Sequence, residues 1–444
     1  MNKRGIILIA GIFLFLIVSA LVLYWPKPDC NETNTCPLEE ESLQIMGAID
    51  DRPEFQAFLQ KMYSNNESFN ISYLEGNIET YEEDLIDLMT STTATAPDIF
   101  LIKNSWLPRF KNKLAPAPAS DMDYNKFSEL FVDVAVNDFV SDSKVYGVPL
   151  YVDNLALYWN KDLFSNAGIS QPPKNWDEFL TDALKMTKKE SISIIQSGVA
   201  MGGVENINHS VDILYTLMMQ LGTAMNEKKG QPRVYFMNDN SDLKSRVTSE
   251  SQYSPAASAL RFYTDFSIPE KESYMWNSLQ HYSVDLFSEG KLAMMFDYSY
   301  VYEDIKKKNP YLNFGIAQMP QPKDVSKATT FADYWGFVVW GGSANKNAAW
   351  KLLKTFTEEP FQKAYIEKFE RPAALRSLID YQKSIRDMGV FGVQALWASS
   401  WYQINDVKIR TIMEDTIKSV ANKTDTSFRA MQKAEDKINS LIKR

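Results

Sequence analysis

The stretch from Tyr146 to Asp162, YGVPLYVDNLALYWNKD, constrains the fold more than any other part of the sequence. After a Gly-Val-Pro turn it becomes almost wholly apolar as far as Trp159, and this pattern predicts a buried strand. Asp153 interrupts the apolar run, and a buried carboxylate costs free energy unless a hydrogen bond or a ligand compensates it. A helix start follows directly, so we expect the strand to cross a core and to lead into a second structural unit.

Upstream of this stretch, short apolar runs alternate with segments of helical periodicity. The predicted strands are residues 43–49, 71–74 and 98–102, and the predicted helices begin near Phe55 and at Tyr81. This alternation is typical of a parallel sheet with helices on its faces, in which ligands bind beyond the carboxyl ends of the strands. Those ends carry Asp51 after the first strand, and Asn104 and Trp106 after the third.

Composition narrows the class of protein. A chain of 444 residues, 45% of them hydrophobic, can bury more than one core and should divide into about two domains. The net charge of −9 provides no basic surface for nucleic acid. Two histidines and two cysteines leave few ligands for a transition metal, so we expect no metal site and no other cofactor. Both histidines, His209 and His281, stand among polar neighbours, and we interpret them as surface or supporting residues.

The N-terminus carries the clearest local signal. The run from Gly5 to Trp25 is uncharged and apolar, follows two basic residues, and is long enough to span a hydrocarbon core of roughly 30 Å. A cleaved signal peptide is the competing interpretation, with residues 18–20 as the cleavage site, but the apolar region of such a peptide is usually only about 7–15 residues long. We therefore expect residues 1–25 to be a single-pass membrane anchor, with the folded domain on the extracytoplasmic side of the cell membrane.

A polar segment follows the predicted anchor. Residues 26–42 are mainly proline, polar and acidic residues, which is typical of a solvated tether. Cys30 and Cys36 bracket the short loop NETNT, and an oxidising compartment outside the cell favours a disulfide between them. A metal site at this pair would need further ligands, and the neighbouring sequence offers none.

Several longer motifs occur in a fixed order after Leu43. They read PDIFLIKNSWLPRF, NKDLF followed by PPKNWDEF, GKLAMMFDYSYVYEDI, and NAAWKLLKTFTEEPFQKAYIEKF. Together they resemble the extracellular solute-binding proteins of the sugar-binding family that includes maltose-binding protein, over the chain from Leu43 onward. The pair NKDLF and PPKNWDEF is the most specific of these motifs. The resemblance implies an α/β, two-lobed periplasmic-binding-protein fold of type II, with a hinge of strands that cross between the lobes.

The resemblance also implies how the chain divides between the lobes. It places residues 43–150 and 298–332 in lobe 1, and residues 154–296 and 337–444 in lobe 2. A hinge made of separate crossing strands moves as one unit, which suits closure around a ligand.

The predicted crossings carry several candidate ligand contacts. Asp153 matches the acidic hinge residue that reaches the ligand in the family, and a strand-end carboxylate bonded to backbone amides is the alternative. Tyr300 falls where the family places an aromatic ring that stacks on a sugar. Asp333 and Trp335 belong to a further cluster, in which period-two alternation lets only one of Tyr334 and Trp335 face the cleft.

Loops of both lobes supply further candidates. Asn104 and Trp106 follow the third strand, where relatives bind sugar hydroxyls, and Trp106 has the alternative of filling the base of that loop. From the second lobe, Asn206, Asn208 and His209 offer hydrogen-bond donors in a glycine-containing loop before a helix, and Trp276 lies in YMWNSL. We expect these side chains to meet the ligand from opposite walls of the cleft.

Arg371, in ERPAALRSL, matches a turn that lies beside the cleft in relatives. A guanidinium at this position could hold hydroxyls or a carboxylate of the ligand. The alternative, a salt bridge to Glu367 or Glu370, is equally compatible with the sequence.

The predicted function is that of an extracytoplasmic solute-binding protein of an ABC importer, which works as a monomer and binds a carbohydrate, most simply an oligosaccharide, between its lobes. Its partners would be this ligand, the permease subunits and the membrane. Asp153 and Asp333 could approach each other as a glycosidase pair, but no nucleophile elbow, phosphate-binding loop or metal motif supports an enzyme. A membrane-tethered sugar sensor or adhesin on the same fold is the alternative function.

Overall fold

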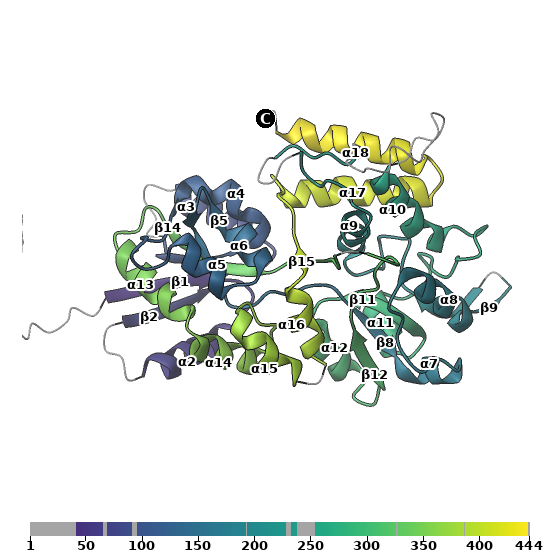
Figure 1. Cartoon of the computed structure of the whole chain (residues 1–444), viewed down its shortest axis with the longest axis horizontal. Helices are drawn as coiled ribbons and strands as arrows, with labels where there is room; N and C mark the ends of the chain where they lie inside the picture. The colour runs from purple at the N-terminus through teal and green to yellow at the C-terminus, as the bar shows by residue number, and fades with distance from the viewer. Residues whose placement is uncertain are drawn as a thin grey trace, which may run out of the picture.

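The computed structural model describes residues 41–64, 69–90, 96–191, 193–227, 232–237, 254–325, 327–385 and 387–442. The predicted anchor, the Cys30–Cys36 pair and all but the last two residues of the predicted tether lie outside these ranges. None of the helices within them combines the length and the apolarity that a membrane span requires. The described chain forms two lobes that lie side by side, each built around its own sheet (Figure 1).

Strands and helices alternate along most of the chain. The strands are β1 (Glu41–Gly47), β2 (Phe69–Glu75), β3 (Ile99–Lys103), β4 (Leu114–Ala115), β5 (Val140–Ser141), β6 (Lys144–Val145), β7 (Gly147–Pro149), β8 (Ala156–Asn160), β9 (Lys188–Glu190), β10 (Ser193–Val199), β11 (Leu292–Asp297), β12 (Phe314–Ala317), β13 (Thr330–Phe331), β14 (Trp335–Trp340) and β15 (Ala398–Ser399). The helices are α2 (Arg52–Tyr63), α3 (Tyr81–Thr90), α4 (Leu107–Phe110), α5 (Tyr124–Leu130), α6 (Asp133–Phe139), α7 (Lys161–Asn166), α8 (Trp176–Met186), α9 (Ser210–Gln220), α10 (Pro255–Thr264), α11 (Ser283–Ser288), α12 (Val301–Lys308), α13 (Lys346–Phe356), α14 (Glu359–Phe369), α15 (Ile379–Lys383), α16 (Gly389–Ala395), α17 (Asp406–Ala421) and α18 (Ser427–Leu441).

The sheet of lobe 1 has the strand order β2-β1-β3-β14-β4, and β7 also pairs with β14. β1 pairs in parallel with β2 and with β3, which confirms the predicted parallel unit. The first four residues of β3 are apolar and buried, as expected for a strand that is covered on both faces, and its last residue is Lys103. Asp51 caps α2 by accepting the backbone N–H of Glu54, and this fixes where the helix after β1 begins.

The sheet of lobe 2 has the strand order β12-β8-β11-β10-β9. β8 is the buried strand that the sequence predicts before Trp159, and it pairs antiparallel with both β11 and β12. Asn160 then accepts the backbone N–H groups of Asp162 and Leu163, which starts α7 where a helix is predicted. The chain thus enters the second unit just before β8, and the stretch predicted as one strand is divided between β7 in lobe 1 and β8 in lobe 2.

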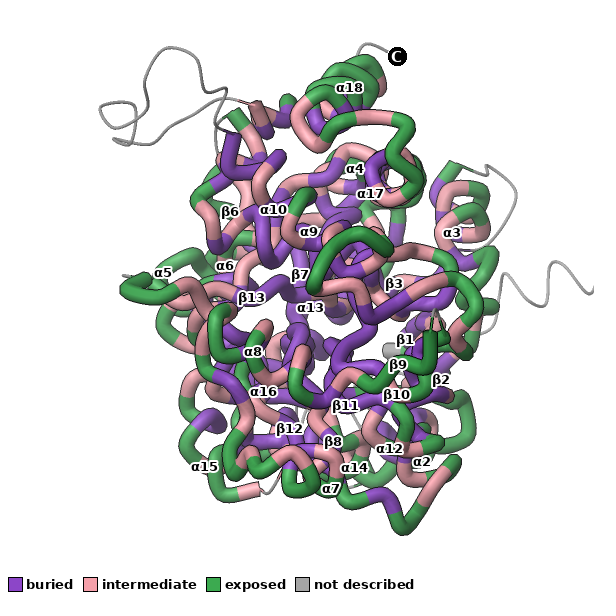
Figure 2. The backbone as a smooth tube through the Cα atoms, turned by 90° about the vertical axis from the view of Figure 1, so that its right-hand side faces the viewer, coloured by how far each residue is buried: buried purple, intermediate pink, exposed green. Residues whose placement is uncertain are grey.

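Each lobe has its own apolar core. The core of lobe 1 draws its residues from 43–152 and from 332–398, whereas the core of lobe 2 draws them from 155–331 and from 388–438. Figure 2 shows burial concentrated on the strands in the middle of the molecule, with exposed residues along the outer helices.

The expected division of the chain between the lobes is wrong for two segments. We predict residues 298–332 in lobe 1, but β12 pairs with β8, and the buried residues as far as Phe331 pack in the core of lobe 2. The reverse holds for the start of residues 337–444, because β14 pairs with β3 and the helices α13 and α14 pack in lobe 1. Most buried residues from Met388 onward return to lobe 2. Long-range strand pairing decides these placements, and the order of the motifs does not reveal it.

Hydrogen bonds tie the crossing segments together. The first crossing between the lobes is formed by residues 152–155, and the second by residues 331–334. The backbone N–H of Leu155 in the first crossing donates to the carbonyl of Phe331 in the second (3.0 Å). The side chain of Asn154 reaches α16, where Gln394 Nε2 donates to its Oδ1 (2.8 Å). The lobes are thus connected by a hinge of bonded crossing segments.

Candidate functional site

A cavity of about 500 Å³ lies between the two lobes. Its lining residues come from the carboxyl ends of β1 and β3, from the first and second crossings, and from the segments before α9, after β11 and after α14. They are Ala48, Ile49, Ile78, Lys103, Tyr151, Asp153, His209, Tyr298, Tyr300, Asp333, Trp335 and Arg371. Because both lobes form its walls, any rotation of one lobe against the other opens or closes this cavity.

Two smaller cavities continue the cleft between the lobes. A narrow one of about 10 Å³ shares Lys103 and Asp333 with the main cavity. It shares Trp401 with a third cavity of about 310 Å³, which Tyr402 also lines. The cleft therefore extends beyond its main cavity as far as Trp401 and Tyr402, with a constriction at the narrow cavity, whose volume is no larger than one water requires.

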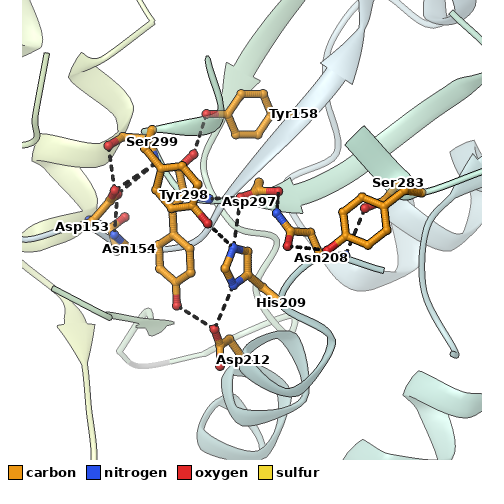
Figure 3. A network of polar contacts seen from close by, with 12 residues as sticks. Asp153, Asn154, Tyr158, Asn208, His209, Asp212, Ser283, Asp297, Tyr298 and Ser299 are labelled. Atoms are coloured by element: carbon orange, nitrogen blue, oxygen red, sulfur yellow. Dashed lines mark hydrogen bonds and ion pairs between the residues drawn. The ribbon is translucent and has the colours of Figure 1, made fainter. Parts of the chain in front are cut away.

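Asp153 is buried at the first crossing (Figure 3). Its carboxylate accepts the backbone N–H of Asn154 (2.9 Å), and it accepts both the backbone N–H (3.0 Å) and the hydroxyl (2.7 Å) of Ser299. Burial raises the pKa of Asp153 to about 6, and the hydrogen bonds from Ser299 oppose that rise. The carboxylate thus joins the first crossing to the segment after β11. These bonds match the structural alternative for this residue, in which backbone amides compensate the charge.

His209 lies on the wall that lobe 2 contributes, directly before α9, with a left-handed φ of 55°. Its ring stands between two buried carboxylates, with Nδ1 3.3 Å from Asp212 and Nε2 3.4 Å from Asp297 (Figure 3). Burial lowers the pKa of the imidazole, but the two carboxylates outweigh this effect and raise the pKa of His209 to about 9. His209 is therefore a cation at neutral pH. Its Nε2 also lies 2.6 Å from the hydroxyl of Tyr300.

Asp212 stands at the centre of the polar network around His209. It is fully buried, accepts the hydroxyl of Tyr298 (3.1 Å), and pairs with Arg410 (2.7 Å) as well as with His209. Burial raises the pKa of this carboxyl, but Arg410 and His209 lower it more, so the pKa of Asp212 lies below its usual value. No group of three or more His, Cys, Asp or Glu side chains in the described ranges could hold a metal ion. The arrangement is therefore an ion-pair network.

Lys103, the last residue of β3, pairs with two carboxylates at the cleft. Its Nζ lies 2.9 Å from Asp333 and 3.8 Å from Asp406. Burial lowers the pKa of Lys103, but the two carboxylates raise it above its usual value. The same carboxylate of Asp406 accepts the indole N–H of Trp106 (3.1 Å). Asp333 and Lys103 thus enter the cleft as a neutralised pair.

Arg371 lies on the wall that lobe 1 contributes. Its guanidinium carbon is 5.3 Å from the centre of the Tyr151 ring. No carboxylate in the described part of the chain lies within 4.0 Å of its side-chain nitrogens, and its buried Nε has no hydrogen-bond partner there. The alternative salt bridge to Glu367 or Glu370 is therefore absent from the structure.

Aromatic side chains give the cavity flat apolar surfaces. Tyr300 keeps 43% of its surface exposed, and its ring stacks on that of Tyr298 with 6.2 Å between the ring centres. Trp335 lines the cavity and packs edge-on against Trp106, with 5.2 Å between the ring centres. Tyr334 is fully buried and does not line it, so only one of the two adjacent aromatic residues faces the cleft, as the alternation predicts.

The sequence matches the family of bacterial extracellular solute-binding proteins over residues 70–363. The chain belongs to this family. A protein of Brucella abortus (strain 2308) that is named as a binding protein is 26% identical over 351 residues, which are 76% of this chain and 77% of that protein. The galactooligosaccharide-binding protein of Bacillus subtilis (strain 168) is 20% identical over 249 residues, which are 56% of this chain and 54% of that protein.

A solved structure shares the fold of this solute-binding protein. The cyclic α-maltosyl-1,6-maltose binding protein of Arthrobacter globiformis superposes with a TM-score of 0.73 at 17% identity, covering 91% of this chain and 99% of that one. The likeness extends over both lobes and confirms the predicted two-lobed α/β fold.

The main cavity of this solute-binding protein brings together several of the predicted ligand contacts. These are Asp153, Tyr300, Asp333, Trp335 and Arg371. Asn104 lines the third cavity, where its Nδ2 donates to Asp138 (2.8 Å). Trp106 packs against Trp335 and does not line the main cavity. It fills the base of its loop, which is the alternative interpretation given above for this residue.

Three predicted contacts lie away from the cavity. Asp51 is exposed and caps α2. Trp276 is fully buried in the core of lobe 2, and its indole N–H donates to Asn206 Oδ1 (2.9 Å). Asn206 Nδ2 donates in turn to the carbonyl of Asn277 (2.9 Å). Because these bonds occupy their polar atoms, Asn206 and Trp276 stabilise lobe 2 from inside.

Sequence reasoning missed several residues that line the cleft. Of the two interpretations of His209, the ordinary surface or supporting residue is wrong and the position in a loop that faces the cleft is the one observed, because its ring lines the main cavity. Lys103 could have been found by the reasoning that selected Asn104, because both stand at the carboxyl end of β3, where ligands bind in parallel sheets. Trp401 and Tyr402 come to the cleft because β15 pairs with β13, and the sequence gives no signal of that pairing.

Proposed function

We propose that this solute-binding protein captures a carbohydrate, most simply an oligosaccharide, in its interlobe cleft and delivers it to the permease subunits of an ABC importer. The composition of the main cavity carries this proposal: the aromatic faces of Tyr300 and Trp335 lie among charged and polar groups. A sugar needs both, because its C–H faces stack on aromatic rings while its hydroxyls require hydrogen-bond partners. Two of the similar proteins are named for oligosaccharide ligands, which agrees with this assignment.

In this proposal the protein works as a tethered monomer outside the cytoplasm. The apolar run of residues 1–25 anchors it in the membrane, and residues 26–42 leave the lobes free to meet the permease. Ligand binding favours the closed arrangement of the lobes because only that arrangement offers both walls of the cleft to the same ligand.

Thermal unfolding of the purified full-length chain with a panel of saccharides tests the proposal. A ligand that binds only the folded state stabilises it by about 2.7 kcal/mol at a concentration of 100 times its Kd. Tyr300→Ala and Trp335→Ala should each weaken the affinity about 3- to 10-fold, because each removes an aromatic contact. Tyr311→Ala is the matched control, since Tyr311 is 93% exposed and does not line the cavity. Shifts with peptides or polyamines and none with any saccharide would contradict the proposal.

A further inference from the structure

Arg371 differs from the other cations at the cleft because it lacks an acidic partner. Lys103 pairs with Asp333 (2.9 Å), and His209 stands between two carboxylates. Arg410 pairs with Asp212 (2.7 Å). Three of the described cationic side chains line the main cavity: Lys103, His209 and Arg371. Within the described ranges, Arg371 alone among these three forms no ion pair within 4.0 Å. Its charge is therefore the one that the fold leaves uncompensated at short range.

The position of Arg371 is fixed although its guanidinium is unpaired. Its backbone N–H donates to the carbonyl of Ile366 (3.2 Å), and the carbonyl of Arg371 accepts Nε2 of Gln382 (2.8 Å). The guanidinium rests on the ring of Tyr151, which limits its rotation. A fixed guanidinium loses less entropy when it binds a ligand than a mobile one does.

Two buried carboxylates lie in the same region, but each has other donors. Asp50 accepts the hydroxyl of Tyr365 (3.0 Å), and Asp153 accepts three N–H or O–H groups at the hinge. Both influence Arg371 only through longer-range attraction. The hydrogen-bond donors of the guanidinium therefore remain available to a ligand in the cavity.

We propose that the carbohydrate bound in this cleft is acidic, and that Arg371 binds its carboxylate through two parallel N–H···O bonds. The proposal rests on the proposed function and narrows its ligand to uronic or sialic acid sugars. A planar guanidinium matches a carboxylate in geometry, and one cation balances one negative charge. A phosphate dianion fits less well because it would place a second negative charge near Asp50 and Asp153.

Binding measurements with matched pairs of saccharides test this inference. The panel holds glucuronate, galacturonate, mannuronate, guluronate and sialate sugars as monosaccharides and short oligomers, each beside its neutral methyl ester, with glucose 6-phosphate and glucose 6-sulfate added. Calorimetric titration of the full-length wild type should show one acidic sugar binding at least about tenfold more tightly than its ester. That preference should shrink as the salt concentration rises, because screening weakens ion pairs.

A substitution then assigns the preference to Arg371. Arg371→Gln should weaken binding of the acidic sugar about 10- to 150-fold and leave the affinity for the neutral ester nearly unchanged. Arg376→Gln is the matched control, because Arg376 lies five positions further along the chain and pairs with Asp133 outside the main cavity. It should bind both sugars as the wild type does.

The outcomes separate this inference from the proposed function. Equal affinity for acids and esters in the wild type overturns the inference alone, as does tighter binding of the phosphate or the sulfate. An acid preference that Arg371→Gln retains also overturns it. Binding of no saccharide overturns the proposed function as well. If Arg371→Gln does not fold, the acid preference of the wild type and its loss at high salt still decide the question.

Discussion

The two walls of the cleft each present a cation, but the two cations stand in opposite electrostatic surroundings. On lobe 2, His209 lies between Asp212 and Asp297, and Arg410 completes the network. On lobe 1, Arg371 rests on Tyr151 without an ion pair to any described residue. A cation inside a closed network contributes to the stability of the fold, whereas a cation without a partner is available to a ligand. The comparison predicts that substitutions in the network of lobe 2 lower the stability of the ligand-free protein, whereas substitution of Arg371 on lobe 1 lowers the affinity for the ligand.

The largest effect on stability is expected for Asp212→Asn on lobe 2. The isosteric change removes a buried negative charge and leaves Arg410 without its partner at 2.7 Å, while His209 keeps only Asp297. Breaking a fully buried pair on one side costs about 3–5 kcal/mol, and the 35% exposure of the Arg410 side chain brings the expected loss to the lower end of that range. Urea unfolding of the ligand-free protein measures this loss.

Asp415→Asn is the control for this substitution. Asp415 lies on α17, like Arg410, but it is exposed. The same chemical change there should leave the urea midpoint at its wild-type position. If Asp212→Asn also unfolds at that midpoint, the network on lobe 2 is not structural and the contrast between the walls disappears.

Local sequence patterns were sufficient to predict the first strands and helices of lobe 1, from β1 to β3, and the start of lobe 2. The strand β3 could be predicted because both of its faces are buried, and the start of α7 because Asn160 caps it with its own side chain. The placement of residues 298–332 in lobe 2 could not be predicted from local patterns, because it depends on the pairing of β12 with β8, which lies about 150 residues earlier in the chain. Pairing at that separation leaves no mark in local periodicity.

The candidate site shows the same limit at the level of single side chains. The apolar neighbours of Asp153 indicate that its carboxylate is buried at a cost in free energy, but its main hydrogen-bond partner, Ser299, lies 146 positions away in the chain. His209 could be identified as a hydrogen-bond donor in the loop before a helix, but Asp297, one of the two carboxylates beside its ring, comes from the distant strand β11. The sequence thus identified residues that need a partner and could not identify the partner.

A smaller effect, which depends on pH, is expected for His209. Its folded-state pKa of about 9 exceeds the unfolded value of 6.5, so its stabilising contribution is complete below pH 6.5 and is lost as the pH rises to 9. A shift of this size corresponds to about 3 kcal/mol at most. Wild type should therefore lose stability between pH 6.5 and 9 relative to His209→Gln, which has no imidazolium to deprotonate.

Unfolding in urea at several pH values measures this loss, and His281 provides the control. His281 is exposed and pairs with Glu289, which is also on the surface of lobe 2. His281→Gln should keep the pH profile of the wild type. Parallel pH profiles for wild type and His209→Gln would show that Asp212 and Asp297 do not stabilise the protonated imidazole. The cations on the two walls would then differ less in ion pairing than the interatomic distances indicate.

The smallest effect on stability is expected for Arg371→Gln in the absence of ligand. The substitution removes a cation–π contact worth about 0.5–1 kcal/mol at most sites, but it also removes the cost of keeping an unpaired charge partly buried. Asp50 and Asp153 keep their hydrogen-bond donors, so neither becomes an unsatisfied group, and what they lose is the longer-range attraction by which the guanidinium lowers the pKa of each. The free energy of unfolding should therefore change by about 1 kcal/mol or less in urea. A loss as large as that of Asp212→Asn would show that Arg371 is held by the fold, and that both walls of the cleft use their cations for stability.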